Sequence, residues 1–126
     1  MRKIMTLLVM IMILGGCGAE KQESGYRQIT AEEAKTMMEE QADAVILDVR
    51  EQDEYDEKHI PGAVLLPVGT IDEETAAAAI PEKDTVVLVY CRSGNRSKTA
   101  STALAGLGYT QVYEFGGIND WPYETE

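Results

Sequence analysis

Apolar runs, separated by polar and glycine- or proline-containing segments, divide the chain into short strands and helices. The uninterrupted apolar run at residues 86–90 is typical of a strand that is covered on both faces in the middle of a parallel sheet. Shorter, mainly apolar runs at 45–47, 64–66 and 112–115, the last interrupted by Glu114, predict further strands. We therefore expect a sheet with residues 86–90 in its interior.

Helical patterns fall between these strands. Two of the helices are expected to start with a capping box, formed by Thr30 with Glu33 and by Thr70 with Glu73. The expected helices span residues 30–41, 51–58, 70–80 and 97–107. Alternation of strand and helix predicts an α/β sandwich with a mainly parallel sheet. In such folds, ligands bind at the carboxyl ends of the strands.

Composition limits the chain to one ordinary domain. It has 126 residues, of which 44% are apolar and 26% are charged. The 11 glycines and four prolines exclude a collagen-like or low-complexity chain, and two cysteines cannot make a disulfide-dense scaffold. We expect a small globular domain.

The first residues have the profile of a signal peptide. Met1, Arg2 and Lys3 form a cationic start, and residues 4–14 are apolar except for Thr6. This run is shorter than the roughly 20 residues that span a bilayer, so a transmembrane anchor is the weaker interpretation.

The leader ends with the sequence Leu14-Gly15-Gly16-Cys17, which resembles the lipobox of bacterial lipoproteins. The resemblance implies a signal peptide at 1–16, cleavage before Cys17, and an extracytoplasmic protein anchored to a bacterial membrane by lipid on Cys17. In the alternative interpretation, Cys17 is incidental in an ordinary secretory leader. In the lipoprotein interpretation, residues 17–26 are the lipidated cysteine with a flexible tether, and residues 27–126 are the folded domain.

The net negative charge of the chain argues against anionic binding partners. Loss of Arg2 and Lys3 with the leader leaves nine cations against 22 anions, which takes the net charge from −11 to −13. Nucleic acid and anionic lipid headgroups are poor partners for such a surface. We therefore expect no nucleic-acid binding.

The segment 91–97 lies between the apolar run and a predicted helix, and it holds the candidate nucleophile Cys91. A helix N-terminus preceded by a glycine turn is an anion-binding arrangement of backbone amides. Such surroundings lower the pKa of a cysteine from ~8.5 to roughly 3.5–7.5. Arg92, Arg96 and Lys98 gather in this short stretch of an otherwise acidic chain. The segment therefore predicts a reactive thiolate beside an anion site.

Three ordered motifs show a family resemblance. They are Leu47-Asp48-Val49-Arg50 with Glu54-Tyr55 and His59-Ile60-Pro61-Gly62-Ala63, then Tyr90-Cys91-Arg92-Ser93-Gly94-Asn95-Arg96-Ser97, and Gly116-Gly117-Ile118 with Trp121. Over about residues 27–122, the chain resembles a single-domain rhodanese of the sulfurtransferase family. The resemblance implies a three-layer sandwich with a mainly parallel central sheet and helices on both faces.

The resemblance also implies an activity. Cys91 would accept sulfane sulfur from an anionic donor such as thiosulfate, become a persulfide, and pass the sulfur to cyanide or a thiol. Arg92 would bind thiosulfate, and Arg96 would close the loop. The residues expected to bind the donor are Arg92, Ser93, Gly94, Asn95 and Arg96. No metal or cofactor is required.

Three residues outside that set are expected to support the site. Asp48 and Arg50 are expected near the same sheet edge as Cys91, as a structural charge pair rather than catalytic groups. Ser97 is expected to support the loop. His59 has no second ligand in the sequence for a metal site and is expected to orient the Pro-Gly turn that follows it.

Alternative functions stay open at this point. Related cell-cycle phosphatases have one residue more between their cysteine and arginine, so phosphatase or arsenate reductase activity is a minor alternative. A persulfide carrier that hands sulfur to a protein partner without turnover fits the same motifs. Thiol-disulfide exchange lacks a second cysteine in the mature domain, because Cys17 would be lipidated.

Overall fold

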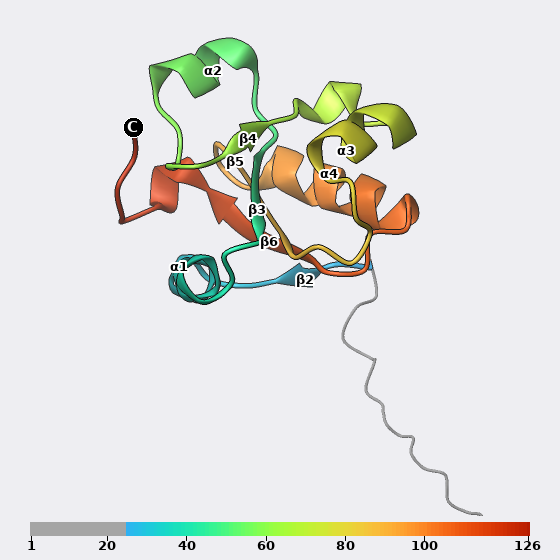
Figure 1. Cartoon of the computed structure of the whole chain (residues 1–126). Helices are drawn as coiled ribbons and strands as arrows, with labels where there is room; N and C mark the ends of the chain where they lie inside the picture. The colour runs from blue at the N-terminus through green and yellow to red at the C-terminus, as the bar shows by residue number, and fades with distance from the viewer. Residues whose placement is uncertain (1–24) are drawn as a thin grey trace, which may run out of the picture.

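A computed structural model describes residues 25–126 (Figure 1). The predicted leader, Cys17 and all but the end of the predicted tether lie outside these residues. The strands are β2 (Arg27–Gln28), β3 (Val45–Asp48), β4 (Val64–Leu65), β5 (Val87–Cys91) and β6 (Val112–Gly117). The helices are α1 (Ala31–Glu40), α2 (Gln52–Glu57), α3 (Glu73–Ala79) and α4 (Asn95–Gly106), with the 3-10 turns η3 (Val68–Thr70) and η4 (Ile118–Asp120).

The five strands form one sheet in the order β2-β6-β5-β3-β4, and every neighbouring pair is parallel. All five residues of β5 are buried, because β6 and β3 flank this strand and helices cover both of its faces. The prediction of a buried strand inside a parallel sheet is therefore confirmed.

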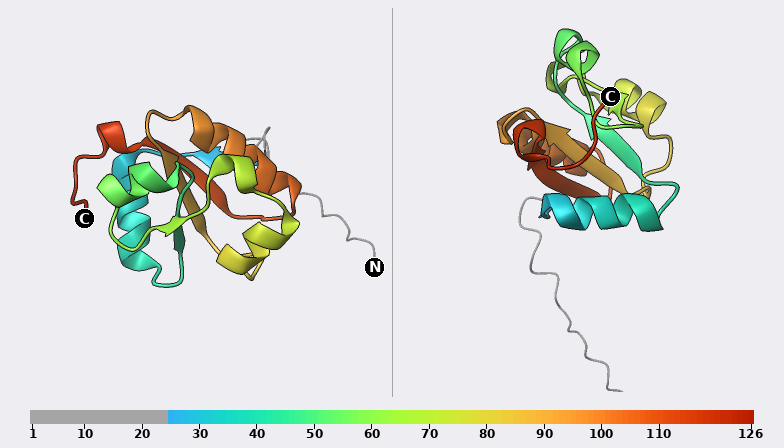
Figure 2. Two further views of the ribbon diagram at one scale, coloured as in Figure 1. Left: turned by 90° about the horizontal axis from the view of Figure 1, so that it is seen from above. Right: turned by 90° about the vertical axis from the view of Figure 1, so that its left-hand side faces the viewer.

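Two apolar clusters fill the two sides of the sheet. Leu104 of α4 and Ile80, which follows α3, pack with Val89 on one side. On the other side, Ala34 of α1 packs with Leu88 and Phe115. The left view of Figure 2 shows α1 and α2 on one side of the strands and α3 and α4 on the other. The predicted three-layer α/β sandwich is confirmed.

The prediction that Thr70 caps the third helix is wrong. Thr70 ends the turn η3, where its hydroxyl donates to the Pro67 carbonyl at 2.8 Å. The helix α3 instead begins after Asp72, whose carboxylate accepts the Thr75 amide at 2.8 Å. The Thr75 hydroxyl lies 2.9 Å from the Asp72 amide and completes the capping box. The carboxylate takes the cap because it is a strong N-cap acceptor and Thr70 already has a partner.

The edge strand β2 was not predicted. It has only two residues, both exposed, and parallel pairing of Arg27 with Tyr113 and of Gln28 with Glu114 holds it on β6. Tyr26, just before it, packs against the cluster that contains Leu104 and Ile80. None of the helices within residues 25–126 combines the length and apolar character needed to cross a membrane.

Candidate active site

Cys91 is the last residue of β5 and lies at the carboxyl end of the sheet. The loop that follows is very short, because Gly94 is already the N-cap of α4. Gly94 has a φ of 108°, which a residue without a Cβ adopts at little cost. The tight turn encloses the sulfur, and Cys91 is only 1% exposed.

Polar groups of the turn and of α4 surround the Cys91 sulfur. The Gly94 amide donates to Cys91 Sγ at 3.0 Å, and Ser97 Oγ lies 3.4 Å from the same atom. Burial by itself raises the pKa of the thiol, but hydrogen bonds from the Ser97 hydroxyl and from the amides of Ser97, Gly94 and Ser93 outweigh it. The pKa of Cys91 therefore lies below its ordinary value, which favours the thiolate.

Alkylation of Cys91 by iodoacetamide is expected to reach half its maximal rate at a lower pH than alkylation of a free cysteine. The thiolate is the reacting form, and a lowered pKa preserves it as the pH falls. N-acetylcysteine in the same buffers is the control. A half-maximal pH equal to or above that of the control would contradict the hydrogen-bonded thiolate.

A carboxylate from α2 holds the arginines of the loop. Glu54 accepts two hydrogen bonds from the Arg96 guanidinium, at 2.8 and 3.0 Å, and lies 3.6 Å from Arg92 Nη1. The Arg96 hydrogen bond contributes most to lowering the pKa of Glu54, to about 2. Arg96 is thereby fixed in place, whereas the Arg92 side chain is 57% exposed and makes only the longer contact.

Glu54→Gln is expected to destabilise the protein at neutral pH and to have a progressively smaller effect in acid. Glu54 has a folded pKa of about 2, against an ordinary value of 4.5. Its contribution to the free energy of unfolding is therefore present above pH 4.5 and lost as the pH falls towards 2. Urea unfolding at several pH values measures the difference. Glu57→Gln removes an exposed charge from the same helix as a control, and an equal pH dependence of the two variants would contradict the assignment.

The end of β6 and the turn η4 close the loop from the other side. The Asn119 amide donates to the Arg92 carbonyl at 3.1 Å. A Cβ on Gly117 would overlap that carbonyl and the Cα of Ser93, so the close approach requires glycine. The Gly-Gly motif thus supports the Cys91 loop directly.

Asp48 and Arg50 form a buried ion pair at the same edge of the sheet. Asp48 accepts from Arg50 Nε at 2.9 Å, from Arg50 Nη2 at 2.7 Å and from the Tyr90 hydroxyl at 2.6 Å. Burial and the Asp48 hydrogen bond raise the pKa of Tyr90. Tyr90 packs in the α1-side cluster and Cys91 in the opposite one, so the pair does not contact the nucleophile. Arg50 also donates to the Lys58 carbonyl at 2.7 Å, which holds the end of the helix that carries Glu54.

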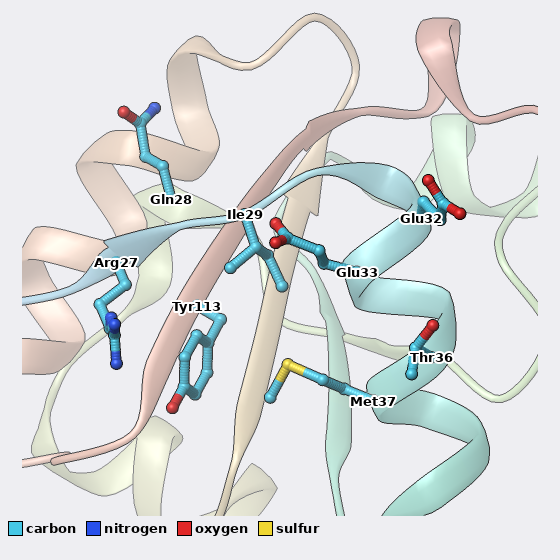
Figure 3. Close-up of a pocket in the computed structure, with 8 residues that line it drawn as sticks. All are labelled: Arg27, Gln28, Ile29, Glu32, Glu33, Thr36, Met37 and Tyr113. Atoms are coloured by element: carbon cyan, nitrogen blue, oxygen red, sulfur yellow. The ribbon is translucent and has the colours of Figure 1, made fainter.

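His59 lies away from the Cys91 loop. Its ring stacks on Tyr55 with centroids 3.8 Å apart, and its Nε2 lies 3.4 Å from a Glu126 carboxylate oxygen. No group of metal-ligating side chains occurs among residues 25–126. A hollow of about 600 Å³ opens between β2 and α1, where Met37 and Tyr113 line it (Figure 3), and no residue of 91–97 contributes to its wall.

The motifs and this geometry agree with a match to a family model, that of the rhodanese-like domain, over residues 30–123. The chain belongs to the rhodanese family. Thiosulfate sulfurtransferase PspE of Escherichia coli is 38% identical over 74 residues, which are 59% of this chain and 70% of that protein. The chain is therefore a rhodanese-like sulfurtransferase.

A solved structure and a second bacterial protein are also similar to this rhodanese domain. A solved structure described as a rhodanese with anions from E. coli superposes with a TM-score of 0.62 at 34% identity, covering 66% of this chain and 96% of that one. The putative sulfur carrier protein YrkF of Bacillus subtilis is 33% identical over 113 residues, or 89% of this chain. The chain spans 60% of the length of YrkF.

The structure brings together the predicted loop residues of the rhodanese domain and adds a residue that sequence analysis missed. Glu114 of β6 is 2% exposed, and its carboxylate lies 2.5 Å from Ser97 Oγ, beside Cys91. The available signal was an acidic residue inside an otherwise apolar strand, which requires a buried polar partner.

Proposed function

We propose that the protein transfers sulfane sulfur from a small anionic donor such as thiosulfate to cyanide or a thiol, through a persulfide on Cys91. The observation that carries the proposal is the enclosed Cys91 sulfur, which accepts the Gly94 amide at 3.0 Å within a turn flanked by Arg92 and Arg96. Backbone amides that stabilise a thiolate can also stabilise the terminal sulfur of a persulfide.

The chemistry balances without a metal or a redox cofactor. The Cys91 thiolate attacks the outer sulfur of thiosulfate, the sulfur–sulfur bond of the donor breaks, and sulfite leaves with the bonding electron pair. An acceptor such as cyanide then attacks the terminal sulfur of the persulfide, and the Cys91 thiolate leaves. This is nucleophilic catalysis in two steps, and the nucleophile is regenerated.

The two loop arginines have different roles in this proposal. Arg92 is exposed and loosely paired, so it can turn towards the sulfonate oxygens of a donor. Arg96 is held by both oxygens of Glu54 and positions the loop. Removal of Arg92 is therefore expected to raise the KM for thiosulfate more than it lowers kcat.

The proposed location is outside the cytoplasm, where lipid on Cys17 would anchor the domain to a bacterial membrane. Its support is the cationic, apolar leader followed by the Gly-Gly-Cys sequence at residues 15–17. A small sulfur donor and a thiol or a protein sulfur acceptor would be the partners there. Metabolic labelling with a palmitate analogue in a bacterial host, with Cys17→Ser as the control, tests this location.

A second candidate function is a persulfide carrier that serves a protein partner and turns over small acceptors poorly. Similarity to a protein named as a putative sulfur carrier favours it. Loading of sulfur on Cys91 is common to both functions, so turnover must separate them.

The deciding experiment measures thiocyanate formed per protein molecule in the full chain carrying Cys17→Ser, which leaves Cys91 as the remaining cysteine. With thiosulfate and cyanide in excess, we expect many cycles per molecule. Formation of one equivalent of thiocyanate per protein molecule, without further turnover, would favour the carrier function over the enzyme function. Hydrolysis of p-nitrophenyl phosphate, measured in parallel, is expected to be absent, and its presence would favour the phosphatase alternative.

A further inference from the structure

Glu114 is a buried carboxylate without a positive partner among residues 25–126, since no ion pair there includes it. Its Oε2 lies 2.5 Å from Ser97 Oγ and accepts the Gly116 amide at 3.0 Å. Its Oε1 accepts from Gln28 Nε2 at 3.2 Å. Burial of a carboxylate without a cationic partner lowers the stability of the folded protein. A buried carboxylate of this kind is therefore a candidate for a functional role.

Ser97 lies between this carboxylate and the nucleophile. Its oxygen is 3.4 Å from Cys91 Sγ and 2.5 Å from Glu114 Oε2, but a hydroxyl has only one hydrogen to donate. If Ser97 donates to an ionised Glu114, its oxygen can accept the Cys91 S–H. If Ser97 donates to a Cys91 thiolate, the short contact to Oε2 needs a hydrogen from Glu114. The two arrangements differ only by a shift of protons along the chain of three groups.

We propose that Glu114 acts through Ser97 as the acceptor of the Cys91 thiol proton. The S–H bond of Cys91 breaks, its proton moves to Ser97 Oγ, and the Ser97 hydroxyl proton moves to Glu114 Oε2. The products are a thiolate and a neutral carboxylic acid, with no change in oxidation state. Glu114 is a positioning residue, because it does not touch the sulfur itself. The inference deepens the proposed function and rests on Cys91 being its nucleophile.

The surroundings leave Glu114 as the available acceptor. The other carboxylate of the site, Glu54, is neutralised by two hydrogen bonds from Arg96. The negative charges of Glu54 and Cys91 raise the pKa of Arg96, on α4. Burial and the charge of Glu114 raise the pKa of Tyr26, just before β2. Lys98 of α4 donates to the Gly94 carbonyl at 3.1 Å rather than to either reacting group.

The Glu114→Gln variant tests the relay, because the relay and the simple loss of a charge change the pH of thiolate formation in opposite directions. Loss of a negative charge near Cys91 would by itself favour the thiolate and move its formation to lower pH. Loss of the hydrogen that neutral Glu114 gives to Ser97 has the opposite effect, because the Ser97 hydroxyl then donates to the glutamine oxygen and no longer stabilises the thiolate. Glutamine keeps the shape of the side chain and an oxygen for the Gly116 amide, but it cannot take up the proton.

The experiment follows the rate of Cys91 alkylation by iodoacetamide against pH in the full chain with Cys17→Ser. We expect Glu114→Gln to raise the half-maximal pH by about one unit. Glu82→Gln, which removes an exposed charge outside the site, is the matched control and is expected to leave the profile unchanged. A half-maximal pH for Glu114→Gln that is unchanged or lower would overturn the relay.

Ser97→Ala tests the link between the two groups. In this background, Glu114→Gln is expected to lose its effect of raising the half-maximal pH. If the rise persists in the double variant, Glu114 does not act through Ser97 and the proposal fails.

If the Glu114→Gln variant does not fold, the relay can still be tested by infrared spectroscopy, which needs no Glu114 variant. Infrared spectra of the Cys17→Ser protein, at the pH where alkylation is fast, are expected to show a buried carboxylic acid band that Ser97→Ala removes. Absence of that band in the Cys17→Ser protein would overturn the relay. None of these measurements uses a sulfur donor, so a protein that shows the relay but never loads sulfur would refute the proposed function alone.

Discussion

Replacement of Cys91 by serine is expected to lower thiocyanate formation from thiosulfate and cyanide by at least about 10³-fold. A serine hydroxyl stays protonated at neutral pH in this site, and the persulfide cannot form on oxygen. The cradle itself should survive, because the smaller oxygen still reaches the Gly94 amide that now contacts the sulfur at 3.0 Å. A coupled colorimetric thiocyanate assay gives the rates.

The matched control for this experiment is Cys17→Ser, which removes the other cysteine and is expected to retain full activity in solution. Urea unfolding of Cys91→Ser checks that the fold is intact. Activity within about tenfold of wild type in a folded Cys91→Ser protein would show that another group carries the reaction.

Removal of the Asp48 carboxylate by substitution with alanine is expected to lower the free energy of unfolding by about 3–5 kcal/mol. Asp48 is fully buried, and three of its contacts are hydrogen bonds from Arg50 and Tyr90. The variant leaves the guanidinium of Arg50, whose side chain is 3% exposed, as a buried charge without a carboxylate partner. Urea unfolding at neutral pH measures the loss.

The double variant Asp48→Ala with Arg50→Met removes both charges. It separates the destabilisation caused by an unpaired Arg50 from the contribution of the ion pair to the free energy of unfolding. We expect the double variant to be more stable than Asp48→Ala alone, because no unpaired charge remains in the interior. If Asp48→Ala costs less than about 1 kcal/mol, the ion pair does not hold this edge of the sheet.

The fold was predictable because its strongest signals are local. The run 86–90 has no polar residue, and only a strand covered on both faces tolerates that pattern. β2 was missed because pairing with β6, rather than its own sequence, makes its two exposed residues a strand. The third helix begins after Asp72 rather than after Thr70, because two capping groups lie close in sequence and only tertiary geometry selects between them.

The site was predictable only where its residues are contiguous. One loop contains Cys91, Arg92 and Arg96, and their spacing in the sequence predicts a reactive cysteine beside an anion site. Glu54 and Glu114 come from distant segments. The apolar neighbours of Glu114 indicate that it is buried, but no local signal shows that either carboxylate lies beside the Cys91 loop. The packing of α2 against the loop brings Glu54 to Arg96, and the pairing of β6 with β5 places Glu114 beside the start of α4. The leader and lipidation of Cys17 stay predictions.

The most direct test of the account is the intact mass of the full chain with Cys17→Ser after incubation with thiosulfate. The account predicts a gain of one sulfur atom, located on the peptide that contains Cys91 and removed on addition of cyanide. A mass that stays unchanged in a folded protein, or sulfur found on any other residue, would contradict a persulfide on Cys91 as the centre of this activity.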